Sequence, residues 1–206
     1  MMDLFIHIPK TGGTSLIQIF ERQLYFSRFK RINPKRNQDP KTFLEEYGQM
    51  LCNLKPSLGS IEMLAGHFPF GAHKFLDDSP SYITLLRDPI DRVISEYYYM
   101  KQQGFYYQQL IENENLGILD YLYHKDTFYL NNLQTRMISG VPITAGEEVI
   151  EKIYQTALDN LDSYFKMAGT TEKFLESLAL LSIKIGWKRR PTILRVNKNE
   201  SRPRNR

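Results

Sequence analysis

The alternation of hydrophobic and polar positions divides this chain into short apolar runs and longer amphipathic stretches. The apolar runs predict buried strands at residues 4–8, 61–65, 82–86, 164–168 and 192–196. Hydrophobic residues at helical spacing predict helices directly after the first strand and at residues 41–54, 89–103, 116–123, 146–161 and 174–181. Because strands and helices alternate, we expect an α/β fold with a mainly parallel central sheet flanked by helices.

Some details of this pattern bear on the site. The helix after the first strand has hydrophobic residues at helical spacing as far as Phe29, and the helix at 89–103 is predicted to bury Ile90, Val93, Ile94 and Tyr97. The polar stretches 28–41 and 104–116 contain no clear period, so we interpret them as loops.

The turn after the first strand has an unusual composition. It reads Pro9-Lys10-Thr11-Gly12-Gly13-Thr14-Ser15. The glycines allow backbone conformations that are closed to residues with a Cβ, and the helix start offers unpaired N–H groups and a partial positive charge. With the lysine and the hydroxyls, the turn predicts a cradle for phosphate or another tetrahedral anion. The alternative is an ordinary strand-to-helix turn with a surface lysine.

The strand at 82–86 leads into a second candidate site, Arg87-Asp88-Pro89. Asp88 suits the N-cap and Pro89 the first position of a helix, so this segment can be read as a capping device alone. Ser95 lies roughly 8–9 Å further along that helix, at ~1.5 Å per residue. An anion held by both Arg87 and Ser95 must therefore lie against the side of the helix.

A histidine follows the strand at 61–65. His67 stands where the carboxyl end of a core strand opens into a cleft, which is where α/β sheets bind ligands. It is a candidate general base, and a hydrogen-bonded structural histidine is the alternative.

Three phrases resemble sulfotransferases that use 3′-phosphoadenosine 5′-phosphosulfate. H-I-P-K-T-G-G-T-S at 7–15 resembles their 5′-phosphosulfate loop, L-R-D-P at 86–89 with Ser95 resembles their 3′-phosphate motif, and A-G-H-F-P-F at 65–70 resembles the segment that carries the base. The similarity is to the branch of the heparan sulfate 2-O- and 6-O-sulfotransferases and their small bacterial relatives. Some relatives have a second histidine two positions before the base. Ala65 stands there in this chain, so we expect no pair of histidines.

The resemblance implies a three-layer, P-loop-like domain spanning residues 1–206. It implies that Lys10 and His67 are catalytic, and that the donor is held by Lys10, Thr11, Gly12, Gly13, Thr14, Ser15, Arg87 and Ser95. The donor would be 3′-phosphoadenosine 5′-phosphosulfate, the product 3′-phosphoadenosine 5′-phosphate, and the acceptor a carbohydrate hydroxyl. No metal and no nucleic acid is implied, and acceptor specificity is expected in the loops at 28–40 and 104–116.

Two further phrases resemble the family. Asn131 to Met137 contains N-x-Q-T-R-M, whose amides and Arg136 can either face the acceptor or brace the sheet. G-T-T-E-K-F-L-E-S-L at 169–178 is expected to be structural, with Thr170 or Thr171 capping a helix. Residues 197–206 resemble the asparagine-bearing segment near the nucleotide.

Composition narrows the class of protein. Of 206 residues, 42% are hydrophobic and 24% charged, as in an ordinary globular domain. Cys52 is the single cysteine and is expected in the core. No apolar run approaches ~20 residues and no signal peptide is evident, so a soluble, cytoplasmic protein is expected.

The charge is uneven along the chain. Residues 188–206 carry eight basic residues and one acidic residue, a net +7, so that the remainder of the total of +4 is −3. We interpret 188–206 as a solvated, partly disordered basic segment.

Two alternative functions remain open. A P-loop-type phosphotransferase would need a magnesium-binding carboxylate, for which Asp88 is the candidate. A non-catalytic nucleotide- or polyanion-binding protein would use the basic segment at 188–206.

Overall fold

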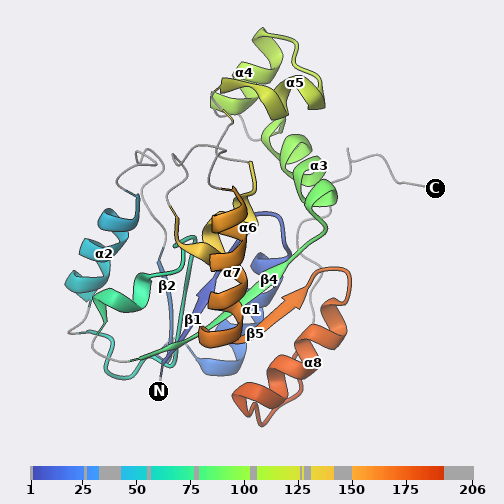
Figure 1. Ribbon diagram of the computed structural model, residues 1–206. Helices are drawn as coiled ribbons and strands as arrows, with labels where there is room; N and C mark the ends of the chain where they lie inside the picture. Colours follow the sequence, from blue (N-terminus) through green and yellow to red (C-terminus); the bar gives the residue numbers. More distant parts are fainter. Residues whose placement is uncertain are drawn as a thin grey trace.

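The computed structural model describes residues 2–25, 27–32, 43–54, 57–76, 79–102, 106–125, 127, 131–141 and 150–192. Its centre is a five-stranded sheet in which every neighbouring pair is parallel (Figure 1). The strands are β1 (Asp3–Ile6), β2 (Phe29–Ile32), β3 (Met63–Gly66), β4 (Ser81–Leu86) and β5 (Phe165–Thr170). Their order across the sheet is β2-β3-β1-β4-β5. The α/β fold with a parallel central sheet is confirmed.

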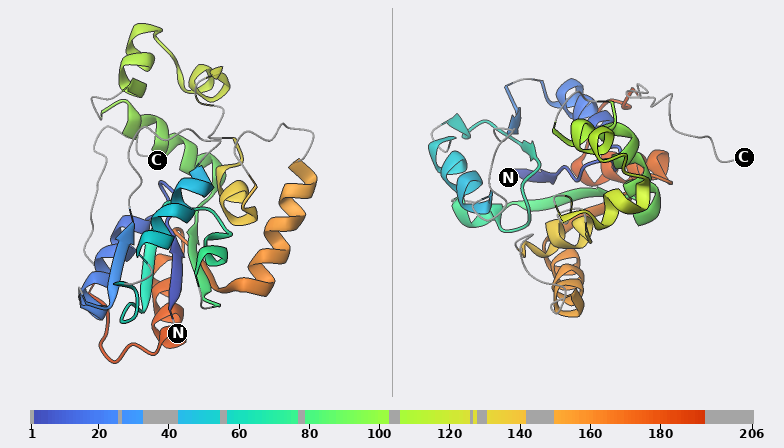
Figure 2. Two further views of the ribbon diagram at one scale, coloured as in Figure 1. Left: turned by 90° about the vertical axis from the view of Figure 1, so that its left-hand side faces the viewer. Right: turned by 90° about the horizontal axis from the view of Figure 1, so that it is seen from above.

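Helices connect the strands and cover both faces. The connecting elements are α1 (Gly13–Leu24), α2 (Phe43–Leu54), the 3₁₀ turn η2 (Ala72–Phe75), α3 (Pro89–Met100), α4 (Tyr106–Asn113), α5 (Ile118–Tyr123), α6 (Leu133–Ser139) and α7 (Ile150–Tyr164), and α8 (Phe174–Ile185) follows β5. Seen from above, α1 and α7 lie on opposite sides of the sheet (Figure 2).

Two hydrophobic cores follow from the alternation of side chains along the strands. Leu4 and Ile6 of β1 pack into the core shared with α2, α6 and α7, whereas Phe5 between them packs into the core under α1 and α8. Successive strand residues point to opposite faces, so an all-apolar strand is buried on both. This produces the three layers of a P-loop-like domain.

A third, smaller core lies outside the sheet. Tyr97 of α3 packs against Ile111 of α4 and Tyr121 of α5. These helices stand above the carboxyl ends of the strands in Figure 1. The loop prediction for 104–116 is therefore wrong where α4 forms. The loop prediction for 28–41 is likewise wrong at residues 29–32, which form β2.

Other expectations need correction. The first helix ends at Leu24, and Phe29 belongs to β2. In α3, Ile90 is 71% exposed, while Arg92 and Glu96 are 2% and 3% exposed. Cys52 is an exposed free thiol and not a core residue.

Some predictions fall beyond the described ranges. The strand predicted at 192–196 lies outside them apart from residue 192, as do residues 146–149, the segment 197–206 and most of the basic stretch at 188–206. Within the described ranges, no helix is both long enough and apolar enough to cross a membrane.

The topology places the candidate residues at one edge of the sheet. β1 is paired with β3 on one side and with β4 on the other. The connection after β1 leads to β2, beyond β3, whereas the connection after β3 leads to β4, on the other side of β1. In parallel sheets a crevice forms at the carboxyl ends of the strands at such a point, and ligands bind there. The turns after β1, β3 and β4 all open into this region.

Candidate active site

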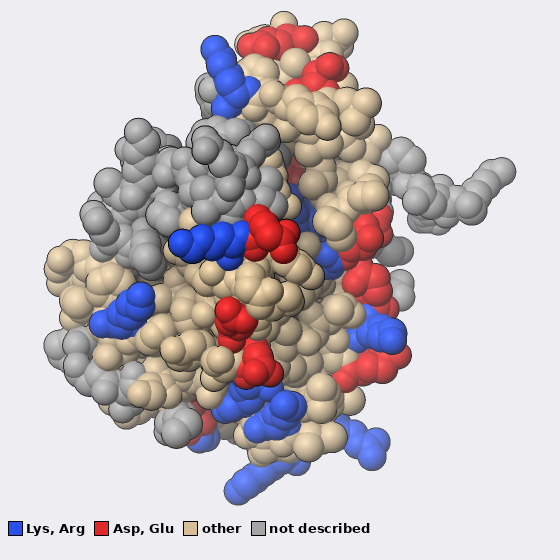
Figure 3. Space-filling model, in the orientation of Figure 1, with Lys and Arg blue, Asp and Glu red and all other residues tan. Residues whose placement is uncertain are grey.

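A cavity of about 510 Å³ lies at the carboxyl ends of β1, β3 and β4. Its lining includes most of the residues predicted from the sequence: Lys10, Gly12, Gly13, Thr14, Ser15, His67, Arg87 and Ser95. Thr11 differs from them, since it is fully buried and its hydroxyl donates to the Ile8 carbonyl oxygen at 2.9 Å. Lys and Arg side chains are visible inside the hollow beside α3 in Figure 3.

The turn after β1 has a constrained backbone. Lys10 has φ 68° and Gly12 has φ 82°, both in the left-handed region. Glycine takes this conformation at little cost, whereas a residue such as lysine holds it at a cost of about 1 kcal/mol or more. The N–H groups of Ser15 and Leu16 then donate to the Gly12 carbonyl oxygen and start α1. Gly13, Thr14 and Ser15 of the first turn of α1 line the same cavity as Lys10.

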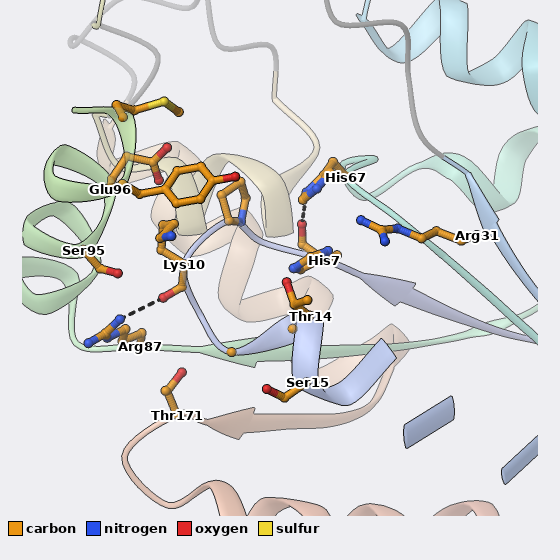
Figure 4. Close-up of a pocket in the computed structure, with 15 residues that line it drawn as sticks. His7, Lys10, Thr14, Ser15, Arg31, His67, Arg87, Ser95, Glu96 and Thr171 are labelled. Atoms are coloured by element: carbon orange, nitrogen blue, oxygen red, sulfur yellow. Dashed lines mark hydrogen bonds between the residues drawn. The ribbon is translucent and has the colours of Figure 1, made fainter. Parts of the chain in front are cut away.

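Neighbouring strand ends hold this turn in place. The Thr171 hydroxyl lies 2.6 Å from the Thr11 carbonyl oxygen and 2.9 Å from that of Leu86. The Arg87 guanidinium donates to the Lys10 carbonyl oxygen at 3.1 Å (Figure 4). The sequence predicts that Thr170 or Thr171 caps α8, and Thr171 does not do so. It instead joins the ends of β1, β4 and β5, and the N-cap of α8 is Lys173.

Arg87 is fixed through its own backbone. Its N–H donates to the Gln134 side-chain oxygen at 2.9 Å, and the Gln134 amide donates to the Arg87 carbonyl oxygen at 2.8 Å. Arg136 is buried and donates to the Asn131 carbonyl oxygen at 3.1 Å. Of the two interpretations of the 131–137 segment, the contacts favour bracing.

Helix α3 begins as the sequence predicts. Asp88 is the N-cap, its carboxylate accepts from the Asp91 N–H at 2.9 Å, and Pro89 occupies the first turn. Because the Asp88 carboxylate makes this bond, the capping interpretation of the residue is supported. No group of three or more His, Cys, Asp or Glu side chains suited to a metal occurs in the part of the chain that the structure describes.

Lys10 lies against α3. Its ammonium is 3.6 Å from the centre of the Tyr99 ring, a cation–π contact. Burial lowers the pKa of Lys10, the Glu96 carboxylate acts against that shift, and Arg87 adds to it. Burial raises the pKa of Glu96, while Arg92, 3.1 Å away, and Lys10 favour its charged form.

Two histidines stack at the other side of the cavity. The rings of His7 and His67 are 4.3 Å apart and inclined by 24°. The Nδ1 atom of His67 lies 2.6 Å from the His7 carbonyl oxygen. A carbonyl oxygen only accepts, so Nδ1 carries the proton, and the lone pair of neutral His67 is on Nε2. The expectation that the site has no pair of histidines is wrong, because the second ring comes from β1 and not from position 65.

Burial favours the neutral form of both rings. It lowers the pKa of His7 from 6.5 to about 2, with His67, Arg31 and Lys10 adding to the shift. Burial also lowers the pKa of His67, the bond to the His7 carbonyl acts against this, and Arg31 adds to it. A neutral imidazole can accept a proton, as a general base must.

Gly13 lets the histidine pair reach the turn. A Cβ at this position would lie 2.2 Å from the His7 Cδ2 atom. Only a residue without a side chain fits there, so the second glycine of the turn serves packing against His7. Sequence reasoning assigned it to the anion cradle alone.

Several residues that line the cavity were not predicted from the sequence. Arg31 lies in a stretch expected to be a loop, and Glu96 becomes part of the site only through packing. Tyr99 lies four residues after Ser95, on the same stripe of α3, and this spacing was the one available signal.

Fold and cavity together define a P-loop-like α/β protein with a cation-lined cavity at its strand ends. The chain belongs to the sulfotransferase family, because the model of the Sulfotransferase family matches residues 4–128. This confirms the resemblance seen in the motifs.

A curated relative gives a further comparison. The chain is 29% identical over 108 residues to the uronyl 2-sulfotransferase homolog pip of Drosophila melanogaster. The matched region covers 50% of this chain and 20% of that protein, so the chain spans about a fifth of its relative.

Proposed function

We propose that this protein transfers a sulfuryl group from 3′-phosphoadenosine 5′-phosphosulfate to a hydroxyl of a carbohydrate acceptor. One observation carries the proposal. The cationic turn after β1, Arg87 at the end of β4, Ser95 of α3 and a neutral histidine all line one cavity. Membership of the sulfotransferase family supports the same reaction.

The donor would bind at the turn and along α3. Lys10 and the first N–H groups of α1 suit the phosphosulfate, since helix starts and lysines bind tetrahedral anions. Arg87 and Ser95 suit the distant 3′-phosphate, which would lie against the side of α3. Holding both ends of the nucleotide orients the sulfur toward the acceptor.

The chemical step is an in-line displacement at sulfur. The acceptor oxygen forms a bond to sulfur while the bond from sulfur to the bridging phosphate oxygen breaks. The proton of the acceptor hydroxyl moves to Nε2 of His67, whose Nδ1–H stays on the His7 carbonyl. The negative charge left on the phosphate lies beside Lys10, which stabilises it.

Arg31 suggests an acidic acceptor. This exposed guanidinium lines the cavity from β2, near the histidines and away from α3 (Figure 4). No carboxylate of the described residues forms an ion pair with it. The related Drosophila protein is named for a uronyl group, and a uronate carboxylate would suit Arg31.

A thermal-shift measurement tests donor recognition. 3′-Phosphoadenosine 5′-phosphate at 100 times its Kd, with a chelator present, should stabilise the protein by about 2.7 kcal/mol. Transfer of label from labelled donor to a panel of acidic and neutral sugars then tests the reaction. A shift with ATP and magnesium but none with this nucleotide would support the phosphotransferase alternative instead.

A further inference from the structure

The ammonium of Lys10 is held by α3 and not by its own turn. Tyr99 lies 3.6 Å beneath it, and the buried Glu96 is the carboxylate whose charge acts on it. Among the described residues no carboxylate lies within ion-pair distance of this ammonium. Its surroundings therefore include an aromatic face and a buried carboxylate, whose effect on the ammonium is opposed by the Arg87 guanidinium.

This arrangement matters because a lysine side chain alone does not fix the position of its ammonium group. Its ammonium stands on a flexible four-carbon stem with about 2 kcal/mol of rotamer entropy, unlike the pre-organised fork of arginine. The stem of Lys10 also starts from a left-handed backbone. A catalytic lysine in this position needs neighbours that limit where its charge can lie.

We propose that Tyr99 and Glu96 are positioning residues that hold the Lys10 ammonium where the leaving phosphate develops its charge. The proposal rests on the proposed function, because it assumes that Lys10 acts on that phosphate. The Tyr99 ring limits the lateral position of the ammonium, since the attraction is strongest over the ring face. Glu96 supplies the negative charge that favours the ammonium over the neutral amine.

One helix then controls both ends of the donor. Ser95 and Tyr99 are four residues apart and share a stripe of α3, and Glu96 lies beside Ser95. Arg92, which pairs with Glu96 at 3.1 Å, holds the carboxylate from the preceding turn. The helix that contacts the 3′-phosphate is the helix that places the catalytic lysine.

Glu96 should have opposite effects on binding and on turnover. A carboxylate that lines an anion site repels the donor, so its presence weakens binding. The same charge favours turnover by holding Lys10. General damage to the fold would instead weaken both properties together.

The Tyr99 series tests the aromatic contact. In the full chain, Tyr99→Leu should lower kcat by about 5- to 30-fold, and Tyr99→Phe should stay within about 2-fold because it keeps the ring face. Tyr98→Leu is the matched control, since Tyr98 packs into the third core and does not line the cavity. A kcat for Tyr99→Leu equal to wild type, or equal losses in the Leu and Phe variants, would overturn the role of Tyr99.

Glu96→Gln tests the charge. Calorimetric titration with 3′-phosphoadenosine 5′-phosphate should show binding tighter by about 2- to 5-fold, while kcat falls. Weaker binding together with lower kcat, or no change in either, would overturn the role of Glu96. If the variant does not fold, because Glu96 is buried beside Arg92, the Tyr99 series still decides whether α3 positions the lysine.

Failure of the inference and failure of the proposed function give different results. If wild-type protein neither binds this nucleotide nor transfers sulfate, the function is wrong. If wild-type protein does both and Tyr99→Leu matches it, the function stands and the positioning role is wrong.

Discussion

The two sides of the cavity are held in place by different means. On the proposed donor side, defined by Lys10, Arg87 and Ser95, the backbone is held by Gln134 and Thr171 through hydrogen bonds to the ends of β1 and β4. On the proposed acceptor side, defined by His7, His67 and Arg31, one hydrogen bond to a carbonyl oxygen and a ring stack fix the two histidines. Several hydrogen bonds to the main chain thus fix the first side, whereas a single hydrogen bond and a ring stack fix the second. Changes on the two sides should therefore separate donor affinity from turnover.

The largest expected effect is that of His67→Ala. Turnover should fall by about 10²–10⁴, the usual contribution of a positioned base, while affinity for 3′-phosphoadenosine 5′-phosphate stays within about 2-fold. Steady-state kinetics and calorimetric titration measure the two quantities, and circular dichroism checks the fold. Normal turnover in a folded variant would mean that another residue is the base. The two sides of the cavity would then no longer differ in that only one of them carries the base.

The pH dependence of wild type sharpens the same point. Burial lowers the pKa of His67, so the ring should remain a neutral base to a lower pH than an ordinary histidine does. In a pH profile of kcat, the loss of rate on the acid side should therefore come at a lower pH than the usual titration of histidine.

Arg87→Ala should have the next largest effect, on the donor side. A hydrogen bond between charged groups contributes about 1.5–3 kcal/mol, so affinity for the nucleotide should fall by about 10- to 150-fold. Arg22→Ala is the control, since Arg22 is an exposed arginine in the last turn of α1. Equal losses in the two variants would mean that general positive charge, and not Arg87, holds the 3′-phosphate.

Gly13→Ala changes the turn after β1, but its main effect should be on the histidines of the acceptor side. The new Cβ would lie 2.2 Å from the His7 ring, which is confined between His67 and Phe5. We expect a loss of about 1–3 kcal/mol in the free energy of unfolding, and lower turnover as His67 is displaced. Gly59→Ala is the control because nothing lies within 4 Å of its Cβ. Full stability and turnover in Gly13→Ala would show that the histidine stack does not depend on this contact.

Arg31→Gln should have the smallest effect. Exposed charge pairs contribute about 0.2–1 kcal/mol, so KM for an acidic sugar should rise by up to about 5-fold at low salt and less at high salt. KM for a neutral sugar should not change. Lys30→Gln removes the same charge from the same strand at a residue that does not line the cavity. If both variants behave alike, the effect comes from net charge, and the acceptor side has no anion contact of its own.

The elements that the sequence predicts well are those with local signatures. A few neighbouring residues are enough to predict each of these features. They are the helix cap at Asp88, the turn formed by the glycines after β1, and the buried strand β4. β2 was missed because F-K-R-I sits at the sheet edge, in a basic stretch, where polar residues are tolerated. α4 was missed because its Tyr and Gln residues blur the helical period, and its packing comes from α3 and α5.

The unpredicted part of the site consists of contacts between distant segments. His7 and His67 are 60 residues apart in sequence, and their stacking depends on the register of β1 against β3. Glu96 is polar and four residues from Arg92, which in a sequence suggests an exposed helical pair. The fold instead buries both. The polarity of a residue type indicates only how often that type is buried on average. It therefore cannot identify a charged side chain, such as that of Glu96, which tertiary contacts bury.

The central place of β1 has a consequence for synthesis. Asp3 pairs with Met63 on one side and with Ser81 on the other, so both partners of this strand emerge much later from the ribosome. At a translation rate of ~5–20 residues per second, β3 is synthesised about 3–12 s after β1. During that time an apolar strand with two open edges is exposed in the nascent chain, a hazard for aggregation. We expect this segment to be prone to aggregation during translation, and the sheet to be complete only after β5 has been made.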